Sequence, residues 1–243
     1  MQVLGDAVAR DRRSDAPALR HAPSGREYDY RRFCTTAWKV GNFLRNEGVR
    51  RGATVLVADE PEPEPVVTLY GAALLGATVS FVEGETADPV AARDIDAQPR
   101  ALVAPTHRLG AFDVGPRTRP IAYGTEPASP GVAYFERDVW SENPTMPPDA
   151  VAAEDSLLRT RGGTSTHGDV MGAAHEVVER YGLGTDDSVA VRGSFAEPGV
   201  VVAGLIAPVV AGATVLFPDG ETGDASVGID GAEPTEIDPE RVM

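Results

Sequence analysis

TRGGTSTHGDV, the stretch from Thr160 to Val170, joins a short apolar run to an amphipathic pattern. The run from Ser156 to Thr160 predicts a strand, and Val170 to Tyr181 predicts a helix that ends at Gly182. A turn rich in Gly, Ser and Thr between a strand and a helix is typical of phosphate sites, because backbone N–H groups and the helix N-terminus converge on the anion. We therefore predict that this turn has the shape of a phosphate loop.

The charge of this turn conflicts with its shape. The turn contains no lysine, and its last part carries Asp169, whose carboxylate repels an anion. His167 and Asp169 are two ligand-type side chains two positions apart, which is weak evidence for a metal site. We predict no metal and no catalytic residue here. The candidate phosphate-binding residues are Thr160, Gly162, Gly163, Thr164, Ser165 and Thr166.

Strand and helix patterns alternate along most of the chain. Strands are predicted at 54–58, 78–82, 101–104, 156–160, 188–192 and 213–217, with a further candidate strand at 121–123. Helices are predicted at 28–45, 66–75, 88–97, 170–181 and 199–210. This alternation indicates an α/β fold with mainly parallel sheet layers and helices on both faces.

The same patterns divide the chain into four parts. Residues 1–27 are expected to be a polar lead-in, and residues 28–150 a first α/β subdomain in which 105–150 is connecting structure. Residues 151–218 restart the pattern as a second α/β unit that contains the altered phosphate loop. Residues 219–243 are an acidic, Gly-rich tail that we expect to be mobile.

Composition limits the function classes. The chain has 243 residues, of which 42% are hydrophobic, so it can bury a sizeable core. No run reaches the roughly 18 to 20 apolar residues that a membrane helix needs, and the N-terminus lacks a signal-peptide pattern. Cys34 is the only cysteine, which excludes an internal disulfide and a multi-cysteine zinc site. We therefore expect a cytoplasmic protein without a membrane partner.

The chain is strongly acidic, with a formal net charge of −15, and Lys39 is its only lysine. The acidic residues are scattered rather than grouped in blocks. This favours a solvated surface suited to a salty cytoplasm, and hence a halophilic source, over an acidic face for a basic partner. Nucleic-acid binding is disfavoured, because phosphate contacts need a basic patch.

Several phrases of the sequence resemble the adenylate-forming ligases, a superfamily of AMP-binding enzymes that includes acyl-CoA synthetases, luciferases and adenylation domains. These phrases are EGVRRGATV at 47–55, GATV at 76–79 and LIAPVVAGATV at 205–215, and their order follows that of the family. In the family, the turn that corresponds to 160–170 reads TSGTTGxPKGV and wraps the ATP β- and γ-phosphates. The resemblance implies the fold of the first half of the family's large N-terminal domain.

The departures from the family pattern bear on activity. Gly162 and Thr164 keep the family identities, whereas Gly168 stands in place of the lysine and Asp169 in place of a glycine. The family's adenine-binding segment, acidic metal residue, ribose-binding aspartate and C-terminal catalytic lysine have no counterpart in this sequence. DPERV at 238–242 resembles only the opening of the family's next helix. The resemblance therefore implies a truncated relative with an altered phosphate loop.

Two other groups are better interpreted as structure than as chemistry. Gly193-Ser194-Phe195-Ala196 lacks the closing glycine of a nucleophile elbow, so it predicts a turn after a strand. Cys34 has no base nearby in the sequence, and we expect a half-buried helix cysteine.

Three functional hypotheses remain open. The first is a family member without adenylation activity of its own, a pseudoenzyme or scaffold. The second is a component of a split acyl-CoA ligase that a separately encoded fragment, or self-association, completes. The third is a non-catalytic module that binds a nucleotide or another anion. The resemblance alone implies ATP or AMP as a ligand.

Overall fold

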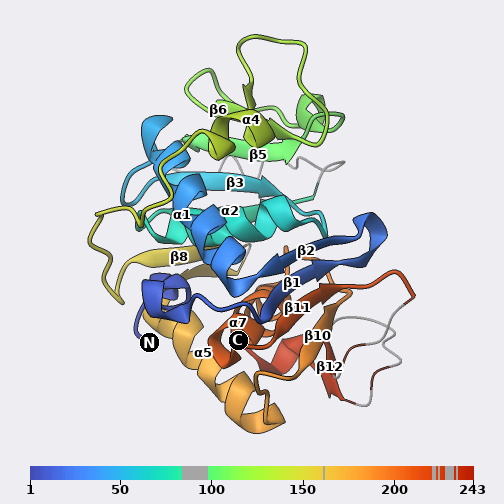
Figure 1. The fold of residues 1–243 in the computed structure, drawn as a ribbon. Helices are drawn as coiled ribbons and strands as arrows, with labels where there is room; N and C mark the ends of the chain where they lie inside the picture. The colour runs from blue at the N-terminus through green and yellow to red at the C-terminus, as the bar shows by residue number, and fades with distance from the viewer. Residues whose placement is uncertain (84–97, 161, 221–222, 224, 228–232, 234) are drawn as a thin grey trace.

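The chain forms two mainly parallel β-sheets with helices packed between and around them (Figure 1). The computed structural model describes residues 1–83, 98–160, 162–220, 223, 225–227, 233 and 235–243. Hydrophobic side chains of both sheets join one core cluster, so the two sheets pack as one body. No helix among these residues is both long enough and apolar enough to cross a bilayer. The predicted α/β class with mainly parallel sheets is confirmed.

The larger sheet has seven strands in the order β7-β6-β5-β3-β4-β8-β9. Its neighbours pair in parallel except β8 and β9, which form an antiparallel hairpin. The strands are β3 (Thr54–Ala58), β4 (Thr78–Val82), β5 (Ala101–Pro105), β6 (Arg119–Tyr123), β7 (Ala133–Tyr134), β8 (Ser156–Thr160) and β9 (Gly163–Thr166). The apolar runs predicted at 54–58, 78–82 and 156–160 coincide with β3, β4 and β8.

The smaller sheet has six strands in the order β13-β12-β10-β11-β1-β2, and only β1 and β2 pair antiparallel. Its strands are β1 (Pro17–His21), β2 (Arg26–Asp29), β10 (Ser188–Val191), β11 (Thr214–Phe217), β12 (Ala225–Val227) and β13 (Glu236–Ile237). The N-terminal strand β1 lies between β11 and β2, so the start of the chain completes a sheet that is built mostly from its end.

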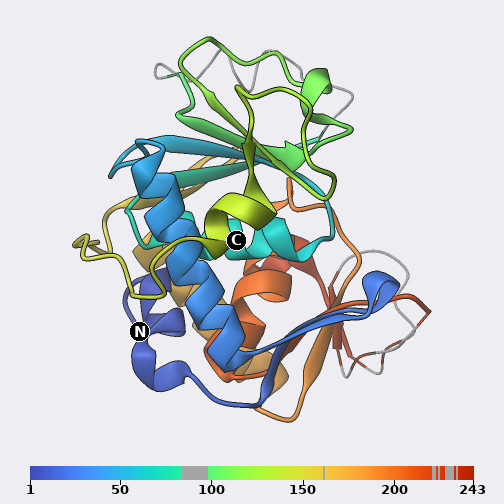
Figure 2. The same ribbon diagram turned by 45° about the horizontal axis from the view of Figure 1, so that its top comes forward.

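The helices are α1 (Tyr30–Asn46), α2 (Pro63–Ala73), α4 (Phe135–Trp140), α5 (His167–Tyr181), α6 (Pro198–Val200) and α7 (Ala207–Ala211). A π-helical segment, η5 (Val201–Ile206), joins α6 to α7. α2 packs against β3, β4 and β5, whereas α1 packs against α2, β1 and β2 (Figure 2). These two helices therefore connect the sheets. The helix predicted at 88–97 lies outside the described residues.

Local sequence explains the longest helix. The Asp29 side chain accepts a hydrogen bond from the backbone N–H of Arg32 at 2.6 Å, which caps the start of α1. Phe33, Ala37 and Val40 follow at helical spacing and are fully buried. The chain leaves the helix at Gly48, whose φ of +87° is a conformation that favours glycine.

Both ends of the chain differ from the sequence prediction. Residues 1–27 were expected to be a polar lead-in, yet Leu4 and Val8 are fully buried and β1 is an interior strand. The tail at 219–243 was expected to be mobile, yet its described part supplies β12 and β13. Short strands at a sheet edge carry too few residues to show a period, and the N-terminal apolar residues are interrupted by arginines and aspartates. The segment 105–150 likewise contains β6, β7 and α4 rather than connecting structure alone.

The close crossing of α1 and α2 generates a prediction. A Cβ at Gly71 would lie 2.6 Å from Val40 Cγ1 and 2.9 Å from the Gly41 nitrogen, so Gly71→Ala forces the helices apart. We expect it to lower the free energy of unfolding by about 1 to 3 kcal/mol.

Gly172→Ala is the matched control, because a Cβ at this exposed position of α5 meets nothing within 4 Å. We expect this variant to raise the free energy of unfolding by up to about 1 kcal/mol through helix propensity. Denaturant unfolding of both variants checks the account, and equal effects of the same sign would contradict it.

Candidate functional site

The segment predicted as an open phosphate loop is a β-hairpin followed by a helix. β8 and β9 pair from Ser156↔Thr166 to Thr160↔Gly163, so the turn at the tip is short. Gly163 has φ of +143°, which a side chain would strain. The predicted direct passage from strand to helix is thus wrong, because β9 lies between them. Strand pairing uses backbone N–H and C=O groups of β9 in hydrogen bonds to β8, so these N–H groups are not free to bind an anion.

The side chains of the hairpin are engaged locally. Thr160 Oγ1 accepts from the N–H of Gly162 at 3.2 Å, and Arg159 Nε lies 3.4 Å from Thr164 Oγ1, to which it donates. Gly162, Gly163 and Thr164 are exposed, and Ser165 and Thr166 are half-buried. The hairpin brings the predicted residues together, with exposed hydroxyl and backbone groups on its surface. Whether they hold a phosphate stays a prediction.

Asp169 closes the N-terminus of α5. Its Oδ2 accepts from the backbone N–H of Thr166 at 2.9 Å and from Thr166 Oγ1–H at 2.7 Å. In return, the Asp169 N–H donates to Thr166 Oγ1 at 3.2 Å, which makes a capping box. The hydrogen bonds from the Thr166 backbone and hydroxyl lower the pKa of Asp169. The N–H groups of His167 and Gly168 donate to the carbonyls of Asp155 and Ala153, so together with the capping box the donors at this helix N-terminus are occupied.

His167 is buried rather than available to a metal. Its Nδ1 accepts from the N–H of Leu4 at 3.1 Å, which assigns the ring proton to Nε2, and Nε2 has no partner among the described residues. Burial lowers the pKa of His167 to about 4, against the opposing effect of the Asp155 and Asp6 charges. His167 thus packs in the core, whereas Asp169 caps the N-terminus of α5. In the described part of the chain, no group of three metal-ligating side chains forms.

The carboxyl edges of the two sheets meet beside Asp59, which directly follows β3. Ser194, after β10, donates to Asp59 Oδ2 at 2.5 Å, and the Phe195 N–H donates to Asp59 Oδ1 at 2.9 Å. The buried Phe195 ring packs edge-on against Phe81 of β4 and near Phe217 of β11, with centroids 5.3 Å and 6.0 Å away. The predicted turn after the strand is present, and it joins the sheets. Ligands of open α/β sheets bind at such carboxyl edges.

A buried ion cluster lies at the start of α2. Arg26 Nη1 pairs with Glu64 Oε1 at 2.5 Å, and the same guanidinium pairs with Glu62. Glu64 is only 5% exposed, so an unpaired carboxylate there would be costly. Burial lowers the pKa of His21, whose Nε2 lies 3.7 Å from Glu62 Oε2. The cluster fastens the β1–β2 hairpin to α2. The sequence analysis does not identify this cluster, because the arginine partner is far away in the chain from Glu62 and Glu64.

Cys34 is more deeply buried than expected. Cys34 lies on α1 and is fully buried, and this burial raises the pKa of its thiol to about 11. The thiol is therefore protonated near neutral pH and belongs to the core.

Sequence comparison matches the AMP-binding enzyme family over residues 6–158. Among solved structures, the anthranilate CoA ligase AuaEII with anthranoyl-AMP superposes with a TM-score of 0.77 at 20% identity, over 93% of this chain and 49% of that chain. The N-terminal domain of FACL13 from Mycobacterium tuberculosis gives 0.73 at 16% identity, over 94% and 63%. Apo MatB from Rhodopseudomonas palustris gives 0.74 at 15% identity, over 94% and 49%. No curated protein matches the sequence.

The two parallel sheets joined at their carboxyl edges define the fold of adenylate-forming ligases. The chain belongs to the AMP-binding enzyme family. It spans 49% of the length of the AuaEII ligase that it resembles. The family resemblance inferred from the sequence phrases is therefore confirmed.

The capping box makes the stability of α5 depend on two side chains jointly. Thr166→Val and Asp169→Ala each remove one half of the box, and we expect each to lower the melting temperature by about 2 to 4 °C. Because both act in one motif, the double variant should lose less than the sum of the two. Thermal unfolding measures this, and full additivity would mean that the two side chains act independently.

The buried His167 predicts a dependence of stability on acid. Its pKa is lower in the folded chain than in the unfolded chain, so the unfolded state binds more protons below pH 6.5. This contribution to stability is complete above pH 6.5 and is lost progressively as the pH falls towards about 4, by at most about 3 kcal/mol.

His167→Asn is the matching variant, because its side-chain oxygen keeps an acceptor for the Leu4 N–H and does not titrate in this range. We expect the difference in unfolding free energy between the two proteins to change between pH 6.5 and 4, in favour of the variant at low pH. A difference that stays constant with pH would refute the assignment.

Proposed function

We propose that this chain is a family member that binds a partner or a small ligand through a ligase-type scaffold and does not itself form acyl-adenylates. The observation that carries the proposal is the Asp169 carboxylate at the N-terminus of α5, bonded to Thr166 at 2.9 Å and 2.7 Å. Two donors at the N-terminus of α5 are thereby occupied, and a fixed negative charge stands beside them. Electrostatic stabilisation at the transferred phosphate usually supplies much of the catalysis of such reactions.

The sequence of the hairpin supports the same conclusion. Where the resemblance places the family lysine, this chain has Gly168, which sits in the first turn of α5 with a hypothetical Cβ only 3.3 Å from the Ala153 carbonyl oxygen. Gly168 is exposed and supplies no charge at this position. The charge that offsets the ATP phosphates in the family thus lacks an equivalent at this position.

Direct titration of the purified chain with ATP·Mg²⁺, AMP and CoA in concentrated KCl tests the proposal, together with an assay for acyl-adenylate. We expect no adenylate and no measurable ATP binding by the wild-type chain. Asp169→Asn keeps an acceptor for the cap but removes the charge, so weak ATP binding that the wild-type chain lacks should become detectable in this variant.

Asp186→Asn is the control for this experiment, because Asp186 is exposed and lies in the loop that follows α5. It removes the same charge away from the hairpin and should leave ATP binding unchanged. Acyl-adenylate formed by the wild-type chain with any carboxylic acid would contradict the proposal.

A binding module for nucleotides or other anions is the second candidate, and one observation favours it. Arg159 donates to Thr164 Oγ1 at 3.4 Å, so a cation stands on the hairpin beside the exposed hydroxyls. Binding of AMP without turnover in the same titration would favour this candidate over a pure scaffold.

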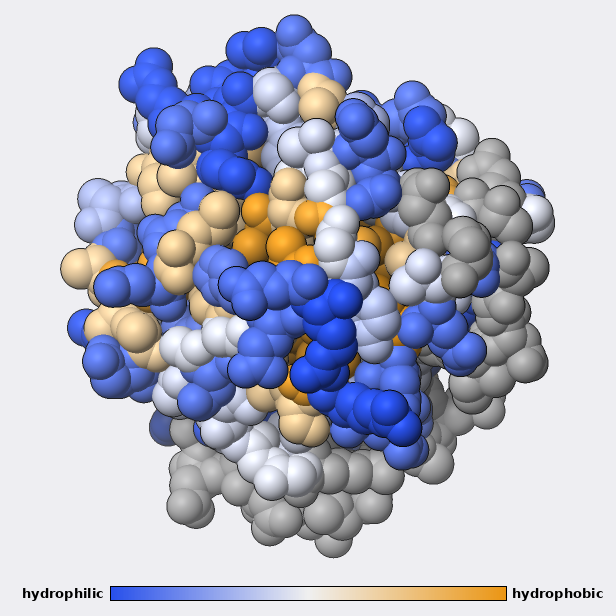
Figure 3. Space-filling model, turned by 90° about the horizontal axis from the view of Figure 1, so that it is seen from below, coloured by the Kyte–Doolittle hydropathy of each residue, from blue (hydrophilic) through white to orange (hydrophobic). Residues whose placement is uncertain are grey.

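Contact with a second polypeptide is a further proposal, and the surface in Figure 3 supports it. In the view of Figure 3, hydrophobic residues are visible near the centre of the face, and hydrophilic residues cross this area and lie above it. Such an arrangement is typical of a protein contact. Size measurement of the native protein distinguishes a complex or a dimer from a free chain.

A further inference from the structure

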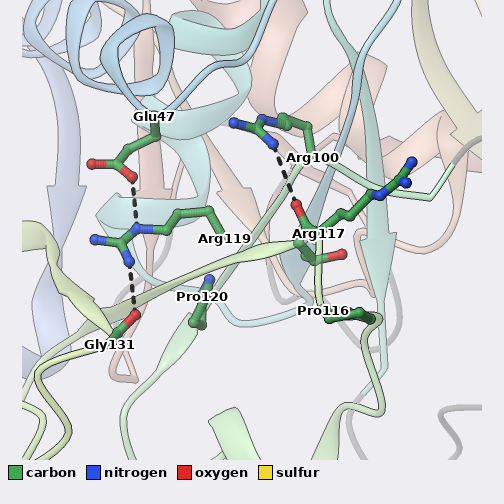
Figure 4. A pocket seen from close by; sticks show the side chains of 8 residues that line it. Glu47, Arg100, Pro116, Arg117, Arg119, Pro120 and Gly131 are labelled. Atoms are coloured by element: carbon green, nitrogen blue, oxygen red, sulfur yellow. Dashed lines mark hydrogen bonds and ion pairs between the residues drawn. The ribbon is translucent and has the colours of Figure 1, made fainter.

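A cavity of about 320 Å³ lies at the amino edge of the seven-stranded sheet (Figure 4). Arg100 directly precedes β5 and Arg119 begins β6, and both strands run parallel to β3. The tip of the β8–β9 hairpin lies at the opposite, carboxyl edge, because β8 runs parallel to β4. The cavity is therefore separate from the hairpin tip. The Thr166–Asp169 cap lies at the same edge as the cavity, but beside β8, which β3 and β4 separate from β5 and β6 in the sheet. Its lining is Glu47, Arg100, Pro116, Arg117, Thr118, Arg119, Pro120 and Gly131.

Two of the three arginines are held in place. Arg119 Nε pairs with Glu47 Oε2 at 2.6 Å, and its Nη1 donates to the Gly131 carbonyl at 2.8 Å. Arg100 Nη1 donates to the Arg117 carbonyl at 3.4 Å. The guanidinium of Arg100 also fills the space beside Gly48, where a Cβ would lie 2.2 Å from its Nη2. Figure 4 shows both side chains extending from the sheet edge towards the end of α1 that carries Glu47.

Arg117 is the third arginine, and its side chain is exposed. Within the described part of the chain, its guanidinium has no hydrogen bond or ion pair, and Arg100 has no acidic partner. Many arginines elsewhere in this acidic chain pair with a carboxylate, as Arg51 does with Asp155 and Arg108 with Glu60. The described lining thus holds three arginines and one acidic residue, Glu47, on a chain whose net charge is −15. Figure 4 shows the Arg117 side chain extending away from those of Arg100 and Arg119.

We propose that this cavity binds the phosphate group of a small phosphorylated molecule. Guanidinium groups match tetrahedral oxyanions in a paired geometry, and a concave site of one sign raises the local concentration of its counter-ion. Arg100 and Arg119 offer the fixed donors, and the exposed Arg117 side chain, which points away from them in Figure 4, reaches the anion through a change of rotamer. Glu47 orients Arg119 and limits the net charge of the site. The volume exceeds what one phosphate needs, which leaves room for a small organic part.

Calorimetric titration with inorganic phosphate and with ribose 5-phosphate tests the proposal. The wild-type chain should bind at least one of them saturably. Arg100→Gln combined with Arg117→Gln should weaken that binding by about tenfold or more, because charge-assisted hydrogen bonds are lost. Tighter binding of ribose 5-phosphate would identify a phosphorylated metabolite as the ligand, and equal affinities would identify free phosphate.

The control is a chain with Arg10→Gln and Arg180→Gln, two exposed arginines away from the cavity. It carries the same net charge as the cavity variant, and its affinity should stay within about twofold of the wild type, since distant exposed charges are screened. Circular dichroism of both variants shows that they remain folded. Failure of the wild-type chain to bind either probe, or equal loss in both variants, would overturn the proposal. The test does not involve the hairpin, so its outcome is independent of the proposed function.

Discussion

The capping box between Thr166 and Asp169 is the contact on which the geometry of the candidate site depends. β9 ends at Thr166 and α5 begins at the next residue, so the capping box fixes the orientation of the hairpin relative to the helix. It also sets His167 at the first position of the helix, with its ring in the core against Leu4. One short motif therefore links the N-terminal residues, the hairpin and the helix, and at the same time occupies the helix end that an anion would need.

The two sheets supply the frame around this motif. Their carboxyl edges are joined by the hydrogen bonds of Asp59 to Ser194 and Phe195, and by packing of the Phe195 ring between strands of both sheets. Ligands of open α/β sheets bind at this edge. Near the start of α2, the ion pairs of Arg26 with Glu62 and Glu64 hold the β1–β2 hairpin against the helix. The fold of this chain matches the AuaEII ligase over 49% of the length of that protein. What differs is the charge at the N-terminus of α5.

Local patterns predicted the interior of the fold well. β3, β4 and β8 coincide with the apolar runs, because a buried parallel strand is a continuous apolar segment with clear turn signals. Prediction failed where long-range pairing decides the structure. β1 and β12 are short, and they are strands because they pair with β11 and β10, residues far away in the chain. Asp169 was identified from the sequence as a charge in the wrong place. Its role as a helix cap depends on β9, which ends at Thr166. The Gly-rich sequence of this segment does not predict a strand.

The two candidate anion sites of this chain differ in their charge. At the base of the hairpin, beside the start of β8, a carboxylate occupies the N-terminus of α5, and along the same edge of the sheet, beside the starts of β5 and β6, a pocket gathers arginines. The most direct measurement of the central claim is an NMR titration of the Thr166 and Asp169 backbone amides with ATP·Mg²⁺. The account predicts that both signals stay in place, because the Asp169 carboxylate keeps the Thr166 N–H. Saturable shifts of these two amides would show that the nucleotide displaces the carboxylate, and would contradict it.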